Sequence, residues 1–199
     1  MIRYIAIHHS GGTKSNPLAT GVNTTFHQIN EAHKQRWPDF PSELNPNWYV
    51  GYNFLLFRDG NLVQTRLIGE ETAAQVGHNL DSVSICLIGN FTKGVDIPTF
   101  EQKTTLRNLL VNLLTTRQNV KIKQGCTFDL NASRIVAHRN LQLDTECFGS
   151  SLPDSFGRDL VGEYVTLLQK LLIHFTTLLN LFKSSKLGNK GRACNNEIL

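Results

Sequence analysis

Short apolar runs alternate with longer segments of helical periodicity along this chain. Runs rich in β-branched and aromatic residues predict strands near 1–7, 50–57, 62–67, 83–89 and 134–137. Apolar residues that recur every three or four positions predict helices near 24–36, 99–117 and 158–182. This alternation predicts an α/β fold, in which a single mixed β-sheet is flanked by α-helices and followed by a long C-terminal amphipathic helix.

Turn and capping residues set several of these boundaries. The four residues at 58–61 have the chemistry of a hairpin turn, so the apolar runs on either side should pair antiparallel. Asn23 or Thr24 is expected to cap the first helix, and Pro98 stands just before the second. Three prolines between positions 37 and 49 predict a loop there.

The helix expected at 158–182 carries a heptad seam. Its apolar residues are spaced by alternating steps of three and four: Val161, Tyr164, Leu168, Leu171, Phe175, Leu178 and Phe182. At 1.5 Å per residue this helix would be about 37 Å long, which exceeds what closing the preceding core needs. Three roles remain open for it: packing on the domain's own back face, forming a homo-oligomer seam, or lying on an anionic membrane surface. Polar residues interrupt the apolar run, so a membrane-spanning helix is not expected.

Composition favours one principal domain, which we place at 1–157, ahead of the helix at 158–182 and a basic flexible tail at 183–199. Of the 199 residues 40% are hydrophobic, enough for one sizeable core. The net charge is only +4, and the tail carries most of it, with four basic residues against Glu197. The domain is therefore nearly neutral, and we expect no nucleic-acid partner.

The beginning of the chain and its cysteines bear on the cellular compartment. The first residues lack the longer apolar run and small-residue cleavage site of a signal peptide, so we expect synthesis in the cytoplasm without export by the general secretory route. The four cysteines are too few and too scattered for a disulfide framework: Cys86, Cys126, Cys147 and Cys194.

Two histidines stand where strands are expected to end. His8 and His138 each follow a short apolar run, and Cys147 follows His138 by nine positions. Imidazole nitrogen and thiolate sulfur are good zinc ligands, and three protein ligands leave a fourth position open, as in catalytic zinc sites. Spacing alone also fits ordinary structural histidines, so both interpretations stand at this point. His33, on the apolar face of the first helix, is expected to be a packed, hydrogen-bonded histidine.

Five segments, in order, bear a resemblance to one enzyme family. They are Ile7-His8-His9-Ser10, then Val50-Gly51-Tyr52-Asn53-Phe54, then Arg58-Asp59-Gly60, then Gly77-His78-Asn79 with residues 84–91, and last Ala137-His138-Arg139 with Thr145-Glu146-Cys147. Together they cover about residues 2–157. The chain thus resembles the zinc-dependent N-acetylmuramoyl-L-alanine amidases, the family of phage lysozyme-type amidases and animal peptidoglycan recognition proteins.

The resemblance implies a zinc ion (Zn2+) as cofactor, peptidoglycan as partner, and a role for each matching residue. His8, His138 and Cys147 would be the metal ligands, whereas His9 would point to the opposite side of the sheet. Tyr52 matches the family's active-site tyrosine, and Thr145 falls where relatives carry lysine or threonine. His78 and Asn79 lie in a segment that the family places near the substrate. The list of implied site residues is therefore His8, Tyr52, His78, Asn79, His138, Thr145 and Cys147.

The implied reaction is hydrolysis of the amide that joins N-acetylmuramic acid to L-alanine. Zinc would activate water and polarise the carbonyl, and hydroxyl donors from Tyr52 and Thr145 would stabilise the oxyanion by about 3 kcal/mol each. Such a protein would act on the cell wall after release, as a phage endolysin or a bacterial enzyme. Two alternatives are a non-catalytic peptidoglycan-binding module and a zinc peptidase that cuts the stem peptide.

The chain departs from the family pattern in three places. The interval from His138 to Cys147 is one residue longer than in many relatives, Phe148 replaces the usual proline, and position 145 lacks the lysine option. We expect the loop at 140–144 to absorb the first two differences. The third affects the expected rate more than the reaction.

Overall fold

Five strands form one mixed sheet in the order β3-β2-β4-β1-β5. The computed structural model describes residues 1–11, 21 and 23–188. Four of the strands run parallel, and β3 pairs antiparallel with β2 at one edge, as the hairpin turn predicts. The strands are β1 (Tyr4–His9), β2 (Phe54–Leu56), β3 (Leu62–Gln64), β4 (Ser82–Leu87) and β5 (Ile135–Ala137). The predicted α/β fold with a single mixed sheet is thus confirmed.

The two longer helices of the first unit, α1 and α2, begin at capping residues. Thr25 caps α1 (Phe26–Arg36): its side chain accepts from the Gln28 N–H at 3.3 Å, and the Gln28 side chain binds back to the Thr25 N–H. The cap is therefore one residue beyond the predicted Asn23 or Thr24, because Gln28 stands three positions after Thr25. A second such capping box starts α2 (Phe100–Leu114). The remaining helices are the 3-10 turn η1 (Ala132–Arg134), α3 (His138–Leu141) and α4 (Phe156–Gly188).

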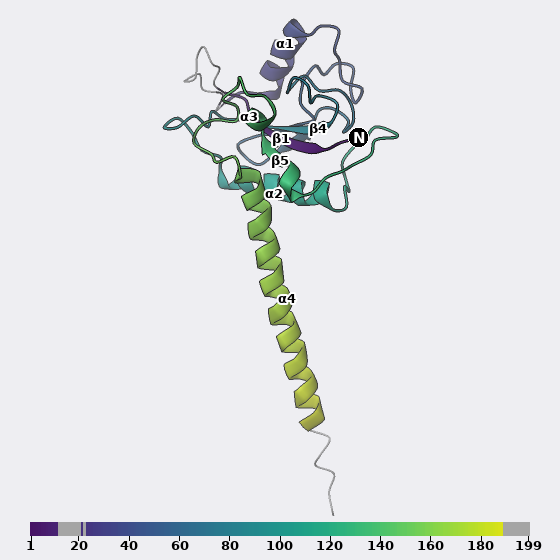
Figure 1. Cartoon of the computed structure of the whole chain (residues 1–199), viewed down its shortest axis with the longest axis vertical. Coiled ribbons are helices and arrows are strands. Elements are labelled where there is room, and N and C mark those ends of the chain that lie inside the picture. Colours follow the sequence, from purple (N-terminus) through teal and green to yellow (C-terminus); the bar gives the residue numbers. More distant parts are fainter. Residues whose placement is uncertain (12–20, 22, 189–199) are drawn as a thin grey trace, which may run out of the picture. The chain divides into compact units, whose positions relative to one another are not determined.

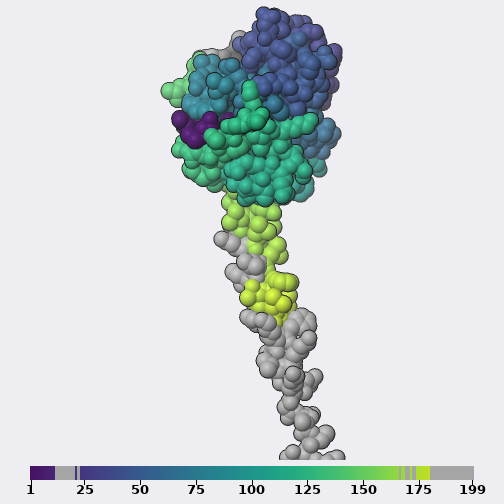
Figure 2. All heavy atoms as spheres, turned by 90° about the vertical axis from the view of Figure 1, so that its right-hand side faces the viewer, coloured from purple at the N-terminus to yellow at the C-terminus, as the bar shows by residue number. Residues whose placement is uncertain are grey.

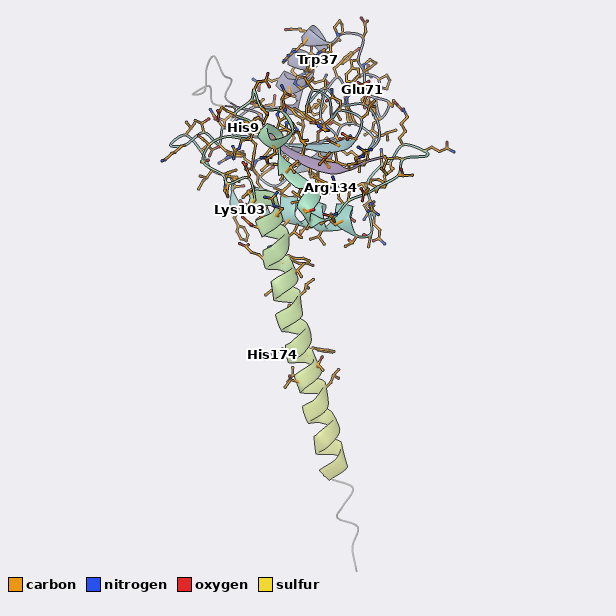
Figure 3. The ribbon with its side chains drawn as sticks, in the orientation of Figure 1. His9, Trp37, Glu71, Lys103, Arg134 and His174 are labelled. Carbon is orange, nitrogen blue, oxygen red and sulfur yellow. The ribbon has the colours of Figure 1, made fainter. Side chains whose placement is uncertain are left out.

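The helices α1 and α2 cover opposite faces of the sheet (Figure 1). The buried apolar residues form two clusters, one on each face of the sheet. In the larger cluster, leucines of α2 pack on alternate residues of the three central strands; in the smaller cluster, Ile29 of α1 packs with Leu55 and Cys86. Figure 3 labels Trp37, at the end of α1, and Lys103, on α2, on these two sides. In the space-filling view, the blue α1 segment and the teal α2 segment lie at opposite ends of this part of the molecule (Figure 2). His8 lies on the α1 face, because it is the β-partner of Cys86.

The first turns of α4 complete the larger core. Leu160 and Val161 are buried, and a Cβ added to Gly157 would lie 2.5 Å from Ile7 Cδ1 and 2.6 Å from Ile135 Cγ2. Only a residue without a side chain allows the helix to approach the sheet this closely. Residues Met1–Val161 form one compact unit, and the chain from Gly162 onward forms a second.

Apolar side chains described on the second unit are exposed. Between 165 and 179 their exposed fractions run from 45% to 61%, as at Val165 and Phe175. In the part of the chain that the structure describes, no helix has both the length and the apolar character needed to cross a membrane. The helix continues to Gly188, beyond the predicted end at residue 182; the rest of the predicted tail, residues 189–199, lies outside the described residues. The three roles considered for this helix stay predictions.

Candidate metal centre

The sheet brings His8 and His138 side by side. His8 stands near the end of β1, and because Ile7 pairs with Ala137 of the neighbouring β5, the next residues, His8 and His138, lie at the same level. The centroids of their rings are 4.4 Å apart. The Cys147 sulfur lies 3.8 Å from His8 Nδ1, and one ligand atom from each of the three residues falls within 4.8 Å of the others. The three residues predicted as metal ligands therefore form one cluster.

Arg139 holds the segment that carries Cys147. Its backbone N–H donates to the Cys147 carbonyl at 2.8 Å, and its guanidinium donates to the Gly149 carbonyl at 2.7 Å and to Asp154. Phe148, in place of the family's proline, is buried in the larger core. The helix α3 and the turn after it take up the longer interval between His138 and Cys147. Cys147 is thus anchored from both sides despite these departures.

Burial controls the protonation of the three residues. Desolvation lowers the pKa of His8 well below its ordinary value, with a further decrease from His138, and burial also lowers the pKa of His138. Without a metal, burial raises the pKa of the Cys147 thiol to about 12. Both imidazoles are therefore neutral, which is the form that binds metals.

The donor set fits zinc. His138 is one of the three clustered residues, and none of the described residues forms a hydrogen bond with its buried Nδ1. Two imidazole nitrogens and one sulfur are ligands that zinc prefers, and three ligands leave one tetrahedral position for water or substrate. A zinc ion at this place would give the unpartnered nitrogen its missing contact.

Tyr52 and Thr145 lie next to the three residues. The Tyr52 ring centroid is 5.2 Å from that of His8, and burial raises the pKa of its hydroxyl well above the usual value. Tyr52 is therefore a protonated hydrogen-bond donor at neutral pH. Thr145 Oγ1 accepts from the Cys147 N–H at 3.2 Å, which leaves its own hydroxyl hydrogen available. Both hydroxyls predicted as oxyanion donors are thus near the metal ligands.

His78 and Asn79 serve other contacts in this structure. The His78 ring packs edge-on against Tyr4, at the start of β1, and its Nδ1 lies 3.1 Å from Asp81. His8 follows Tyr4 by four residues on the same strand, so about 13 Å along the strand separates these two residues. The Asn79 side-chain oxygen accepts from two backbone N–H groups of its own loop. The structure does not bring these two residues into the ligand cluster, and their contact with substrate stays a prediction.

The neighbouring histidines are held by backbone donors. His9 Nδ1 accepts from the Phe91 N–H at 3.0 Å, on the face of the sheet opposite His8, as predicted. His33 Nδ1 accepts from the Gly51 N–H at 2.9 Å, and its ring packs on Trp37 and Tyr52. His33 is thus the packed, hydrogen-bonded residue that its helix position predicts. Of the other cysteines, Cys86 and Cys126 are free thiols, and Cys194 lies outside the described residues.

Sequence patterns missed several residues that hold this site. Arg66 is buried at 1% exposure, donates to the Val50 carbonyl at 2.6 Å and pairs with the equally buried Glu70. It thereby fixes the segment that leads to Tyr52. Gln75 and Gln142 each lie within hydrogen-bond distance of one of the two clustered histidines. No periodicity or motif marks these three residues. Arg66 and Gln75 act on partners far away in the sequence, and Gln142, which stands only four residues from His138, is held by the distant Val76 N–H.

The fold recurs in solved structures of amidases and recognition proteins. The endolysin N-acetylmuramoyl-L-alanine amidase LysCS from Clostridium intestinale is 23% identical, with a TM-score of 0.57 over 81% of this chain and 84% of that one. The Ph2119 endolysin from a Thermus scotoductus bacteriophage is 18% identical, with a TM-score of 0.55 over 80% and 84% of the two chains. A point mutant of Drosophila PGRP-LB, in complex with tracheal cytotoxin, is 21% identical, with a TM-score of 0.53 over 76% and 77%. These likenesses show a shared fold.

Sequence comparison assigns the family. A search of curated proteins found no match. The family described as N-acetylmuramoyl-L-alanine amidase matches residues 1–150, which include all three clustered residues. The resemblance in the five sequence segments is thereby confirmed, and the protein belongs to the N-acetylmuramoyl-L-alanine amidase family.

Proposed function

We propose that this protein is a zinc-dependent N-acetylmuramoyl-L-alanine amidase that hydrolyses the amide between N-acetylmuramic acid and L-alanine in peptidoglycan. The observation that carries the proposal is the cluster of His8, His138 and Cys147, with ligand atoms within 4.8 Å of one another. Family membership supports the substrate, and the endolysin neighbours share the fold. His8 and His138 would bind zinc through nitrogen and Cys147 through its thiolate.

The residues of this chain supply the groups that such a reaction needs. Zinc, when bound, supplies a Lewis acid that polarises the substrate carbonyl and activates water. The Tyr52 hydroxyl, kept protonated by burial, would donate to the oxyanion that develops on the carbonyl oxygen. Thr145 would add a second donor and fix the backbone of Cys147 at the same time. Both hydroxyls also offer a route for the proton that the departing amine must gain.

A cavity of about 470 Å³ lies on the same face of the sheet as His8. Phe57 and Ile88 line it. His8 pairs with Cys86 of β4, and Cys86 pairs with Leu55 of β2; Ile88 and Phe57 stand two residues after these two partners. The cavity therefore lies on the α1 side of the sheet, toward the carboxyl ends of the parallel strands, with Phe26 and Arg58 also in its wall. Apolar walls with a few polar groups are typical of small-molecule sites. We propose that it receives a sugar or peptide part of the substrate.

Two alternative functions would lead to different results with peptidoglycan. A peptidoglycan-binding module would bind the polymer without releasing anything, and the tracheal-cytotoxin complex of a structural neighbour shows that this fold can hold a peptidoglycan fragment. A zinc peptidase would cut between amino acids of the stem peptide. The presence of a complete ligand cluster together with Tyr52 favours catalysis over binding alone.

Mass analysis of digested peptidoglycan distinguishes the three. Purified peptidoglycan is incubated with zinc-loaded protein, and Cys147→Ser protein serves as the matched control. Free stem peptides that begin with L-alanine support the amidase. Internal peptide cuts would show a peptidase, and no release despite sedimentation with the polymer would show a binding module.

Two further proposals concern where the protein acts and what its second unit contacts. We expect the protein to reach the cell wall after release from the cytoplasm, as an endolysin or a bacterial wall enzyme. The exposed apolar residues of α4, such as Leu171 and Phe175, favour contact with a second copy or with an anionic membrane surface. Light scattering and vesicle flotation of the full chain test these two contacts; a monomer that ignores the vesicles would contradict both.

A further inference from the structure

Both clustered histidines present the outer ring nitrogen to a glutamine side chain. His8 Nε2 lies 3.0 Å from Gln75 Oε1, and His138 Nε2 lies 3.1 Å from Gln142 Oε1. On the inner side, His8 Nδ1 is 3.8 Å from the Cys147 sulfur. In each ring, therefore, Nε2 faces a glutamine and Nδ1 is left for the ligand cluster. A neutral imidazole carries its proton on only one nitrogen, so the glutamine contact decides which nitrogen can bind a metal.

The surroundings of Gln75 fix how its amide is turned. Gln75 Nε2 donates to the His78 carbonyl oxygen at 3.2 Å, and a carbonyl can only accept. The NH₂ end therefore points to His78, and the oxygen end must face His8. Ser84 Oγ contacts the same amide at 2.8 Å, and Gln75 is buried. His8 then has to donate from Nε2, which leaves the lone pair on Nδ1.

The same reasoning applies to Gln142 with different partners. The Val76 N–H donates to Gln142 Oε1 at 3.2 Å, and a backbone N–H cannot accept. At the other end, Gln142 Nε2 donates to the Asp144 carboxylate at 2.7 Å. The oxygen of Gln142 thus faces His138, which must also donate from Nε2. This leaves the Nδ1 lone pair on the atom that has no partner among the described residues.

One loop, at residues 74–79, contains Gln75 and also binds Gln142. Gln75 belongs to it, and the next residue, Val76, binds Gln142. Asn79 holds this loop, since its side-chain oxygen accepts from the N–H groups of Ala74 at 3.1 Å and Gln75 at 2.9 Å. The backbone at 74–76 therefore sets the position of both amide oxygens.

We infer that Gln75 and Gln142 are positioning residues that hold His8 and His138 with the proton on Nε2 and the Nδ1 lone pair directed at the metal. The inference rests on the metal site of the proposed function. Partners of this outer kind set the orientation and basicity of metal-binding histidines, and their loss commonly lowers metal affinity about 10- to 100-fold. In this chain both partners are neutral amides, so they fix the histidines without adding negative charge.

The test reads histidine protonation directly in the metal-free protein. Long-range ¹⁵N–¹H NMR of labelled full-length protein distinguishes a proton on Nε2 from one on Nδ1. We expect His8 and His138 of the wild type to be Nε2-protonated, and Gln75→Met and Gln142→Met to turn the corresponding ring into a mixture. Titration with Co²⁺ should show an affinity about 10- to 100-fold lower and an altered visible spectrum in each variant. Gln142→Glu keeps an acceptor and should restore the Nε2 proton.

Gln102→Met is the matched control for buried glutamines. Gln102 is fully buried and donates to the Leu56 and Ile88 carbonyls, away from the histidines. It should lower stability while leaving histidine protonation and Co²⁺ affinity unchanged. If Gln75→Met does not fold, the test rests on Gln142→Met, because Gln142 is only half-buried and its replacement should leave the fold intact.

The outcomes separate this inference from the proposed function. Unchanged protonation together with Co²⁺ affinity within twofold of the wild type in the glutamine variants would overturn the inference. A mixture of protonation states in wild-type metal-free protein would overturn it as well, whatever the metal does. Fixed Nε2 protons in a wild type that binds no Co²⁺ would support the positioning role and contradict the proposed function.

Discussion

The imidazole rings of His8 and His138 lie with centroids 4.4 Å apart, although the two residues stand near opposite ends of the first unit's sequence. Parallel pairing of β1 with β5 puts them at the same level, and Cys147 closes the cluster. Under the proposed function these three residues would hold zinc jointly, so the loss of any one should reduce zinc binding greatly.

We therefore predict that His138→Ala and Cys147→Ser each reduce bound zinc from one ion per chain to nearly none. Serine oxygen is a much poorer zinc ligand than thiolate, and alanine offers no donor. Atomic absorption after dialysis measures the metal content. Cys126→Ser, at a half-buried thiol outside the cluster, is the control and should keep one zinc. One tightly bound zinc in both ligand variants would refute this ligand set.

Tyr52→Phe should keep zinc and lose turnover. The variant retains the ring that packs on His8 and His33 but has no hydroxyl to donate to the oxyanion. Loss of one such donor reduces turnover about 10²- to 10³-fold. Release of L-alanine-terminated peptides and zinc content are measured on the same preparation. Wild-type turnover in this variant would remove Tyr52 from the mechanism.

Arg66→Ala should destabilise the first unit by about 3–5 kcal/mol, because it leaves the Glu70 carboxylate buried and without its guanidinium partner. The segment before Tyr52 would also lose the bond to the Val50 carbonyl. Urea unfolding measures the change. Arg58→Ala removes the more exposed ion pair with Asp96 and should cost only about 1 kcal/mol or less. Equal losses in the two variants would contradict the importance of burial.

His33 should make stability fall as the solution becomes acidic. Burial lowers the pKa of His33 from 6.5 to about 4 in the folded protein, whereas the unfolded chain keeps the ordinary value. Between pH 6.5 and 4 the unfolded state thus binds the proton more readily, so the His33 contribution is complete above 6.5 and decreases toward pH 4.

The measurement is urea unfolding of wild type and His33→Gln at pH 7.5 and pH 5. We expect the variant to lose less stability than the wild type over this interval. His27→Gln, at an exposed histidine of the same helix, should behave as the wild type does. If His33→Gln loses as much stability between pH 7.5 and pH 5 as wild type and His27→Gln do, His33 is not the source of the acid sensitivity.

Two glycines of α4 should respond in opposite directions to alanine. A Cβ at Gly157 would collide with Ile7 and Ile135, so Gly157→Ala is expected to cost about 1–3 kcal/mol. A Cβ at Gly162 would meet no described atom within 4 Å, and the helix there should gain up to about 1 kcal/mol from alanine. Thermal unfolding followed by circular dichroism compares the two. Equal effects would contradict the close approach of α4 to the sheet.

The sequence alone revealed the features that repeat locally or form contiguous motifs. Alternating strand-like and helix-like periods predicted the mixed sheet, and the turn at 58–61 predicted the hairpin. The five ordered segments predicted the family, and those with His8, His138 and Cys147 contained the cluster that the sheet assembles. Local periodicity misplaced edges, such as the cap of α1, where Thr25 and its partner Gln28 decide the boundary. It also missed the short helix α3, which includes the first two residues of the loop predicted at 140–144.

Only the tertiary structure identified the residues that hold the site. Gln75 contacts His8 across 67 positions of sequence, and Arg66 reaches the backbone that precedes Tyr52. Asn79, whose contact with substrate stays a prediction, uses its side-chain oxygen to hold the loop of Gln75. A periodic pattern reports which face of an element is apolar, whereas the role of a buried polar residue depends on which donors and acceptors the folded chain brings to it. That is why the sequence predicted the fold and the three clustered residues of this protein, and why only the packing of the folded chain decided which side chains contact them.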